Sequence, residues 1–414
     1  MVEVFLVLYL LSGLFKALLT FGNFFILPFD LTAFFGILSF SSLLIRNYSQ
    51  GWVIRYYDIS IPLLFMFFWA WMFFSLSYTS SSLCGIPKVF LFGTNFLPLL
   101  IVVLCRSFNV QLFFKTFIIF VLGSSLIFLP LFQLSLEIGY SDDDVKFVTA
   151  YLAIGLYLGL SLLLNVKSSC FCFFKYKNLW FNIFLFLLLI LTGARGPIVF
   201  CCICLFAIYM SCHRINIYSV KIGKRNLISS LLTLSIILCI LISLNRYYDN
   251  ALFELVERTI SRLSTLVMGM LGMGDFDVSS VERGIYITRS WNIITSSPFN
   301  FFFGTGAGSF GVELYNIDVI GSPHNIILEV WLEFGLIGLI LITLLFFFMI
   351  FRRKPSGNIS AYVIIYLFLN LMKSGSLQEM RVFVTFFILY SYYPNLNKVD
   401  YEESCSNISL IKPS

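Results

Sequence analysis

The chain has 414 residues, of which 59% are hydrophobic and only 12% are charged, and its formal net charge at pH 7 is +6. A soluble globular protein of this length cannot bury so large an apolar fraction, so the composition excludes that class. The positive charge does not indicate nucleic-acid binding, because the basic residues fall in short loops between apolar segments, as the orientation signals of membrane proteins do.

Apolar stretches of about 17–25 residues recur along the chain, and this is the length of helix that crosses the hydrocarbon core of a bilayer. A β-barrel would instead show short alternating segments, so we predict an all-α, polytopic inner-membrane protein with about twelve transmembrane helices. The first run contains Lys16 and is predicted to be a retained helix rather than a signal peptide. The predicted spans are residues 3–20, 25–45, 60–78, 89–105, 112–134, 148–165, 179–193, 197–211, 227–244, 325–351, 359–373 and 380–393.

Basic residues occur in alternate loops between these spans. With twelve spans, all of these loops lie on one side, and the positive-inside rule makes that side cytoplasmic, together with both termini. The residues concerned are Arg46, Arg55, Arg106, Lys115, Lys167, Lys175, Lys177, Arg214, Lys221, Lys224, Arg225, Arg352, Arg353 and Lys354.

One long segment, residues 245–323, lies between spans on the opposite side, and we predict a large periplasmic loop that contains helices. We see no linker around it, so residues 1–414 are predicted to form a single transmembrane domain. Within the loop, residues 251–271 show apolar positions at helical spacing, which predicts an amphipathic helix along the bilayer interface.

A second loop helix is predicted from Ser280 to about Thr295. Ser279 and Glu282 match a capping box, which would begin this helix, and Pro298 follows its end. The glycines in Gly304–Gly308 then predict a flexible turn before the chain re-enters the membrane.

His324 is one of only two histidines, and it lies directly before the apolar run Ile326–Phe351. Ser322 is a natural N-cap and Pro323 a natural first helical residue, which would place His324 in the first helical turn. The positive end of the helix dipole disfavours imidazolium there, so a neutral ring could accept a proton as a general base. The alternative is an interfacial polar residue without chemistry.

Asn325, Glu329 and Glu333 follow at intervals of four and form one polar stripe on the predicted helix. Carboxylates inside a transmembrane helix are costly, so they usually face the interior of a bundle or a wet cavity. A structural hydrogen-bond network and a direct role toward substrate remain alternatives for this stripe.

Three arginines are candidates for binding an anionic substrate. Arg195 stands in Gly193-Ala194-Arg195-Gly196-Pro197 between two spans, where small residues would leave the guanidinium accessible; the alternative is an arginine that reaches the lipid headgroups. Arg283 lies in the first turn of the predicted loop helix, near backbone N–H groups that attract anions. For Arg283 and for Arg289 the alternative is a solvated surface arginine, and for Arg289 this explanation is favoured.

The chain shows no Walker-type loop, dinucleotide fingerprint or metal-ligand spacing, so we predict neither a metal site nor a cofactor. A donor activated by a nucleotide on the cytoplasmic side is therefore disfavoured, and the energy for any transfer is expected to be stored in the substrate.

The stretch from about Arg195 to Gly338 resembles the O-antigen polymerase and ligase superfamily of bacterial envelope assembly. The resemblance is strongest over Ser322–Gly338, which reads SPHNIILEVWLEFGLIG. Weaker parts are Thr192–Gly196, Arg283 with Pro298 fifteen residues later, and the Gly304–Gly308 glycines. The N-terminal half matches only as a hydropathy pattern.

This resemblance implies a GT-C-like membrane glycosyltransferase with its site on the periplasmic side. Arg195 and Arg283, with Arg289 as a further candidate, would bind the diphosphate. His324 would serve the acceptor hydroxyl, with Glu329 as a candidate to share that role. Asn325 and Glu333 would support the site, and the reaction would invert the anomeric centre without a metal or cofactor.

The implied partners are undecaprenyl-diphosphate-linked oligosaccharides as donor and acceptor, and membrane lipids. A chain-length regulator and a flippase are further candidates, and no nucleic acid is expected. Ligases often carry another histidine close to the one matched by His324, whereas this chain has Ser322 and Pro323 there, which favours an O-antigen polymerase. The alternatives are an O-antigen ligase acting on lipid A–core, a capsule or exopolysaccharide polymerase and, from another class, a flippase or transporter of lipid-linked oligosaccharides.

Overall fold

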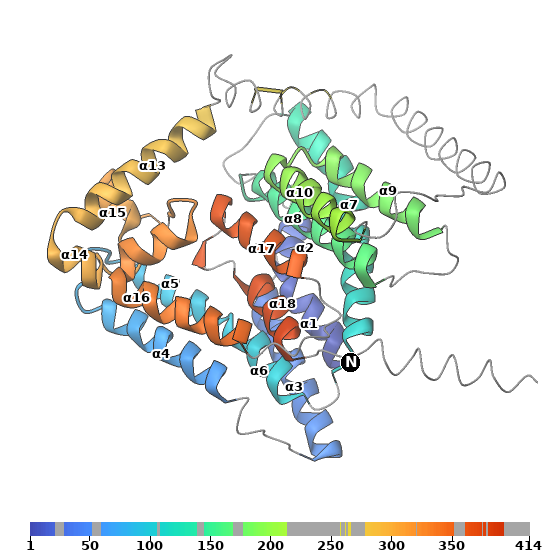
Figure 1. Cartoon of the computed structure of the whole chain (residues 1–414), viewed down its shortest axis with the longest axis horizontal. Helices are drawn as coiled ribbons and strands as arrows, with labels where there is room; N and C mark the ends of the chain where they lie inside the picture. The colour runs from blue at the N-terminus through green and yellow to red at the C-terminus, as the bar shows by residue number, and fades with distance from the viewer. Residues whose placement is uncertain are drawn as a thin grey trace, which may run out of the picture. The chain divides into compact units, whose positions relative to one another are not determined.

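The computed structural model describes residues 1–20, 29–51, 59–105, 108–138, 145–168, 177–212, 257, 261, 264–265, 278–319, 321–351, 361–374, 376–377 and 380–392. Every regular element within these residues is a helix (Figure 1), which confirms the all-α prediction for this part of the chain.

The chain divides into two compact units. Unit 1 comprises residues 1–42, 111–286 and 365–373, and unit 2 comprises residues 43–110, 287–364 and 374–414. The predicted single transmembrane domain stays a prediction. Unit 1 contains α1 (Val2–Leu10), α2 (Ser12–Thr20), most of α7 (Val110–Ile138), α8 (Val145–Ser168), α9 (Lys177–Leu191) and α10 (Arg195–Cys212). Unit 2 contains α4 (Ser60–Ser75), α5 (Gly85–Gly93), α6 (Phe96–Leu104), α14 (Pro298–Phe303), α15 (Phe310–Tyr315), α16 (Ile326–Phe351) and α18 (Arg381–Tyr392), while α3 (Leu31–Gln50), α13 (Val278–Thr295) and α17 (Ala361–Ser374) belong to both.

Unit 1 is organised around α8, which packs against α2, α9 and α10. Tyr366 of α17 is fully buried, and its hydroxyl donates a hydrogen bond to the carbonyl of Leu156 on α8 at 3.1 Å. Gly159 leaves the space for that ring, because a Cβ there would collide with the Tyr366 hydroxyl. Buried polar groups need such partners, and here one tyrosine ties α17 to α8.

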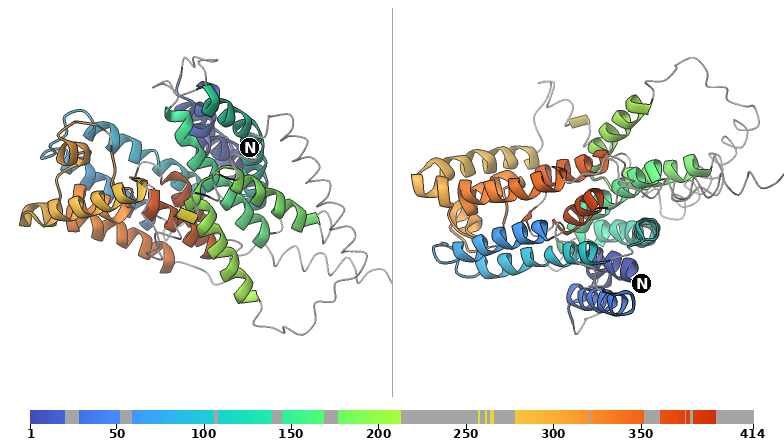
Figure 2. Two further views of the ribbon diagram at one scale, coloured as in Figure 1. Left: turned by 90° about the horizontal axis from the view of Figure 1, so that it is seen from above. Right: turned by 60° about the horizontal axis from the view of Figure 1, so that its bottom comes forward.

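Unit 2 is organised around α16, which packs against α4 and α14 (Figures 1 and 2). Aromatic rings fill the space between its helices. The rings of Phe65 and Phe92 stack with centroids 4.8 Å apart, and Phe68 meets Phe334 edge-on at 5.8 Å. Such ring pairs add to the free energy of burial through their preferred geometry.

Within the described residues, four helical segments are long and apolar enough to cross a membrane: Leu31–Ser49, Gly85–Leu104, Val110–Leu129 and Ile326–Ile350. The pair α1 and α2, bent by 59°, would make a fifth if it is one broken span, and six shorter helices are also apolar. Eleven of the twelve predicted spans overlap one or two of the described helices, and the remaining span, residues 227–244, lies outside the described part. The count of twelve crossings stays a prediction.

Most of the first part of the predicted loop, including nearly all of the helix expected at residues 251–271, lies outside the described residues. The second loop helix is confirmed as α13, Val278–Thr295. Ser279 lies inside this helix, so the predicted capping box does not begin it. The next helix, α14, has Ser297 as its N-cap, and the Ser297 hydroxyl accepts a hydrogen bond from the Asn300 N–H at 3.0 Å.

Candidate functional site

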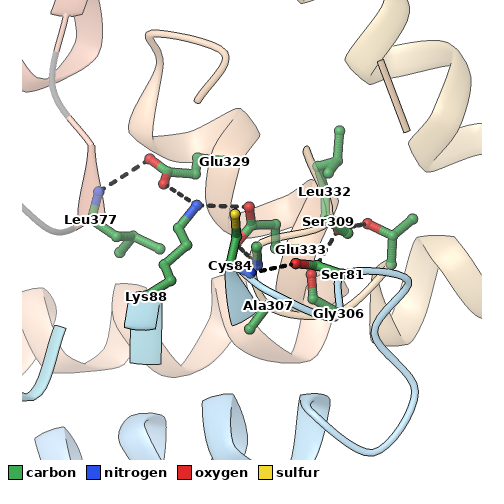
Figure 3. A network of polar contacts seen from close by, with 12 residues as sticks. Ser81, Cys84, Lys88, Gly306, Ala307, Ser309, Glu329, Leu332, Glu333 and Leu377 are labelled. Carbon is green, nitrogen blue, oxygen red and sulfur yellow. Dashed lines mark hydrogen bonds and ion pairs between the residues drawn. The ribbon is translucent and has the colours of Figure 1, made fainter. Parts of the chain in front are cut away.

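A buried lysine in unit 2 pairs with two of the predicted site residues. Lys88 lies on α5, and its Nζ is 2.6 Å from Oε1 of Glu329 and 2.6 Å from Oε1 of Glu333, both on α16 (Figure 3). The three side chains are at most 2% exposed. The two glutamates are four residues apart, about one helical turn, so both can reach one ammonium group. With both carboxyls ionised, one positive and two negative charges leave this Lys88 cluster a formal charge of −1.

The second oxygens of both carboxyls bind backbone N–H groups. Oε2 of Glu333 accepts from the Gly308 N–H, and Oε2 of Glu329 accepts from the Leu377 N–H, both at 3.1 Å. The Leu377 carbonyl in turn accepts from the side chain of Asn95 at 3.2 Å. Burying a charge costs several kcal/mol unless it is paired and hydrogen-bonded. The cluster meets that condition by joining α5 and α16 to two loop segments.

Helix α16 is broken at Gly335, whose φ is 67° and ψ is −171°. The break deprives the preceding carbonyls of their helical N–H partners. Three donors from elsewhere in unit 2 replace them: the Leu332 carbonyl accepts from the Thr305 N–H at 2.8 Å, that of Glu333 from the Gly306 N–H at 2.9 Å, and that of Phe334 from the Trp71 indole at 3.0 Å. In a membrane each unsatisfied backbone group costs several kcal/mol, so these donors make the break tolerable.

The glycine loop, Gly304–Gly308, is packed rather than flexible, and the predicted flexible turn is therefore wrong. Gly304, Gly306 and Gly308 have φ values of 81°, 93° and 75°, and every residue of the loop is buried. A Cβ at Gly306 would collide with the backbone of Thr79. Glycine permits both the left-handed backbone and this close approach, so the loop is compact because of its glycines.

The start of α16 also differs from the prediction. The helix begins at Ile326, and Oδ1 of Asn325 accepts from the N–H groups of Ile327 and Leu328 at 3.1 and 3.2 Å. Asn325 is thus the N-cap, and the predicted cap at Ser322 is wrong. An asparagine adjacent to the apolar run satisfies the first N–H groups directly, so it takes the place of the more distant serine.

His324 precedes this cap and is exposed, with a φ of 54°. It does not occupy the first turn of α16, so the argument that the helix dipole keeps its ring neutral no longer holds. A left-handed φ is uncommon outside glycine and marks backbone that its surroundings hold in place. Its role as a general base stays a prediction.

Two predicted site arginines lie on α13. Arg283 is the sixth residue of this helix, so the prediction that it lies in the first turn, beside the unpaired N–H groups, is wrong. Arg283 is partly exposed and Arg289 is exposed. The guanidinium of Arg289 donates to the Leu314 carbonyl at 3.4 Å, which ties α13 to α15 within unit 2. Six residues separate the arginines, so they point to different faces of the helix, as predicted from the 3.6-residue period.

Arg195 is the first residue of α10, after a turn in which Gly193 has a φ of 69°. It is partly exposed. The neighbouring small residues serve packing: Ala194 is buried, and a Cβ at Gly196 would lie 2.9 Å from Cδ of Lys373 on α17. The sequence motif therefore brings a second cation, Lys373, beside the helix end that begins with Arg195.

The predicted site residues divide between the two units. Arg195 and Arg283 belong to unit 1, whereas Arg289, His324, Asn325, Glu329 and Glu333 belong to unit 2. Within unit 2, the Lys88 cluster brings Glu329 and Glu333 together. The predicted convergence of both unit 1 arginines with His324 stays a prediction.

Sequence reasoning missed Lys88. The predicted span 89–105 begins four residues after Gly85, where α5 begins, and therefore leaves Lys88 in a loop. A lone lysine next to a long apolar run was the available signal, because an ionisable residue in a membrane segment usually has a partner in the bundle. Its two partners are 241 and 245 residues away in sequence, a separation that local patterns do not span.

Asp318 binds the segment that leads into α5. One carboxyl oxygen accepts from the Ser81 hydroxyl at 2.6 Å, and the other accepts from the N–H groups of Ser82 and Leu83, each at 2.7 Å. These hydrogen bonds, that of the Ser81 hydroxyl first, hold the pKa of Asp318 well below its usual range. We call this contact the Asp318 clasp. It ties residues 81–83 to the segment between α15 and His324.

Among the described residues, no group of three or more histidine, cysteine, aspartate or glutamate side chains is arranged to hold a metal ion. Among the cysteines whose side chains the structure describes, Cys84, Cys105, Cys201 and Cys204 are buried and Cys202 is exposed.

Apolar helices of membrane-spanning length, one of them broken around a buried ion cluster, define an integral membrane protein. Residues 180–343 match the family model described as O-Antigen ligase. This match places the segment in the O-antigen polymerase and ligase superfamily and confirms the resemblance found in the sequence. Members of this family are membrane glycosyltransferase-like enzymes of bacteria. No curated protein matches the chain.

Proposed function

We propose that this protein is an O-antigen polymerase. It transfers the growing glycan from undecaprenyl diphosphate to the terminal sugar of an undecaprenyl-diphosphate-linked repeat unit, on the periplasmic side of the inner membrane. The observation that supports this most strongly is the family match over residues 180–343, because that segment contains every residue predicted for the site. The family implies lipid-linked oligosaccharides as substrates.

The proposed chemistry is a displacement at the anomeric carbon of the donor. The bond from that carbon to the diphosphate oxygen breaks, and a bond to the acceptor hydroxyl oxygen forms from the opposite face, which inverts the centre. His324 takes the hydroxyl proton. Arg195 and Arg283, with Arg289 as a further candidate, stabilise the charge that develops on the diphosphate, because fixed guanidinium groups can do so without a metal.

The acidic stripe has a supporting role in this proposal. Glu329 and Glu333 are fully buried and paired with Lys88, and Asn325 caps α16 immediately after His324. A carboxylate held between an ammonium and a backbone N–H is poorly placed to accept a substrate proton. These contacts favour fixing the backbone near His324 over sharing the role of the base.

The second candidate is an O-antigen ligase, which moves the finished glycan onto lipid A–core. The family that residues 180–343 match is named for this activity. The residues before His324 favour the polymerase, because Ser322 and Pro323 stand where ligases often carry a further histidine.

The glycan phenotype of a deletion strain separates these two activities. A lost polymerase leaves single repeat units on lipid A–core, whereas a lost ligase leaves polymer on undecaprenyl diphosphate. Normal long chains on lipid A–core in the deletion strain would contradict both.

Substitutions test the proposed site in the same strain. His324→Ala and Arg283→Ala are expected to abolish long glycan chains while the protein still accumulates in the membrane. Arg352→Ala is the matched control, because two further basic residues, Arg353 and Lys354, keep the orientation signal of that loop. A normal chain-length ladder from His324→Ala would remove the proposed base.

A further inference from the structure

We propose that Lys88 is a positioning residue of the site, which fixes the first half of α16 and with it the backbone that carries His324. The inference rests on the proposed function for what the site does. Its geometry rests on contacts within unit 2 alone.

The break at Gly335 makes the first half of α16 dependent on outside contacts. Ile326–Phe334 is a helix of only nine residues, and isolated helices of this length are marginally stable at best. The Lys88 cluster supplies contacts at both ends of its central turn, through Glu329 and Glu333. Fixing these two residues fixes the rotation of the short helix about its axis.

The short helix connects the cluster to His324 through the backbone. The Glu329 N–H donates to the Asn325 carbonyl at 2.9 Å, and the Asn325 side chain caps the N–H groups of Ile327 and Leu328. His324 is bonded directly to Asn325. A displaced Glu329 therefore moves the cap and the residue next to it.

The choice of charged residues also favours positioning over stability. Replacing a buried ion cluster by well-packed apolar side chains is often neutral or stabilising, so the cluster is weak evidence for stability alone. Apolar packing tolerates small rotations, because it is not directional. Two carboxylates at 2.6 Å from one ammonium do not tolerate such rotations. A rotation of the short helix by one residue, about 100°, would break both ion pairs.

The sequence provides a direct probe of this idea, because the chain contains only two histidines, His213 and His324. In protein purified with isotope-labelled histidine, magnetic resonance gives one side-chain signal for each. His213→Gln and His324→Gln assign them. We expect Lys88→Met to shift or broaden the His324 signal and to leave the His213 signal unchanged.

Two further variants separate positioning from folding. Lys88→Met/Glu333→Gln removes one charge of each sign and keeps the formal charge of −1, so it is expected to fold even where Lys88→Met does not, while its His324 signal is still altered. Lys88→Arg keeps the cation and is expected to restore part of the wild-type signal.

Kinetics on purified lipid-linked repeat units gives a second readout. In the folded variants we expect kcat to fall at least about tenfold with KM little changed, because a misplacement of about 1 Å near the chemistry costs up to 10²-fold. An unaltered His324 signal in a folded Lys88→Met or double variant overturns the proposal. Activity retained by His324→Ala instead overturns the proposal that His324 is the base. The magnetic-resonance result still tests whether Lys88 positions His324.

Discussion

Two apolar helices of this protein satisfy their polar groups in opposite ways. In α7, the hydroxyls of Ser124 and Ser125 donate to the carbonyls of Phe120 and Val121, four residues earlier in the same helix, at 2.7 Å. In α16, the carbonyls freed at Gly335 and both glutamates bind groups from α4, α5, the glycine loop and Leu377.

The difference shows what each helix requires from the rest of the chain. Helix α7 satisfies these two serine hydroxyls internally, so they need no partner from another segment. Helix α16 keeps its shape only while distant segments supply donors, so a change in those segments acts on α16. Irregular backbone in a membrane is tolerated only where protein covers it, and in transporters such broken helices mark functional sites.

A glycine from each helix gives the largest expected contrast. Gly335→Ala should lower the free energy of unfolding by about 4 kcal/mol, since a side chain is strained at this φ and ψ and would collide with the backbone of Phe302. Gly123→Ala in α7 meets open space and should be neutral or slightly stabilising. Thermal unfolding in detergent measures both, and equal tolerance at the two positions would break the comparison.

The removal of one hydrogen bond from each helix tests the same comparison between α7 and α16 more finely. Trp71→Phe leaves the Phe334 carbonyl without its donor and should cost about 1–3 kcal/mol, the penalty for an unsatisfied buried group. Ser125→Ala should cost less than about 1 kcal/mol, because the Val121 carbonyl keeps its helical donor. If the two substitutions lower Tm equally, the indole is not needed to support the break.

The Asp318 clasp extends the comparison to pH. The pKa of Asp318 is lowered in the folded protein, so the clasp stabilises the fold fully above the unfolded-state pKa, near 4, and this contribution is lost as pH falls through the lower folded value. Asp318→Asn should therefore lower Tm by a few degrees at pH 7. The difference from wild type should shrink below about pH 4, and a gap that widens in acid would contradict this assignment.

The smallest expected effect is at the N-cap of α16. Asn325→Ala removes the acceptor for Ile327 and Leu328 and should cost about 1 kcal/mol, whereas Asn325→Asp keeps a capping oxygen and should cost little. Both leave α7 untouched. The difference in unfolding free energy between Asn325→Ala and Asn325→Asp measures the contribution of the cap. Equal unfolding free energies would show that the cap does not hold the start of α16.

Hydropathy predicted most helices well, because crossing a membrane requires a long apolar run whatever the helix packs against. It could not show that one run is two helices. The run Ile326–Phe351 contains two glycines, Gly335 and Gly338, but glycine is common in membrane helices. Only the donors from Thr305, Gly306 and Trp71 make a break at Gly335 tolerable.

For the candidate site, the sequence predicts which residues take part but not which distant residues they contact. Periodicity placed Glu329 and Glu333 on one face, which the Lys88 cluster confirms. The partner itself comes from a distant helix, and tertiary contacts of that kind leave no local trace. The cap of α16 was misassigned for a different reason: Ser322 and Asn325 are both good capping residues, and only their distance from the helix start decides between them.

The break at Gly335 also has a consequence for the surrounding bilayer. The uninterrupted second half, Leu336–Phe351, is about 24 Å long at 1.5 Å per residue, which is shorter than a hydrocarbon core of about 30 Å. Hydrophobic mismatch of this size favours local thinning or a position of the break a few ångströms below the headgroups. The chain length of the surrounding lipids should therefore affect the Lys88 cluster. Short-chain lipids relieve the mismatch, whereas long-chain lipids draw the charged first half of α16 toward the hydrocarbon.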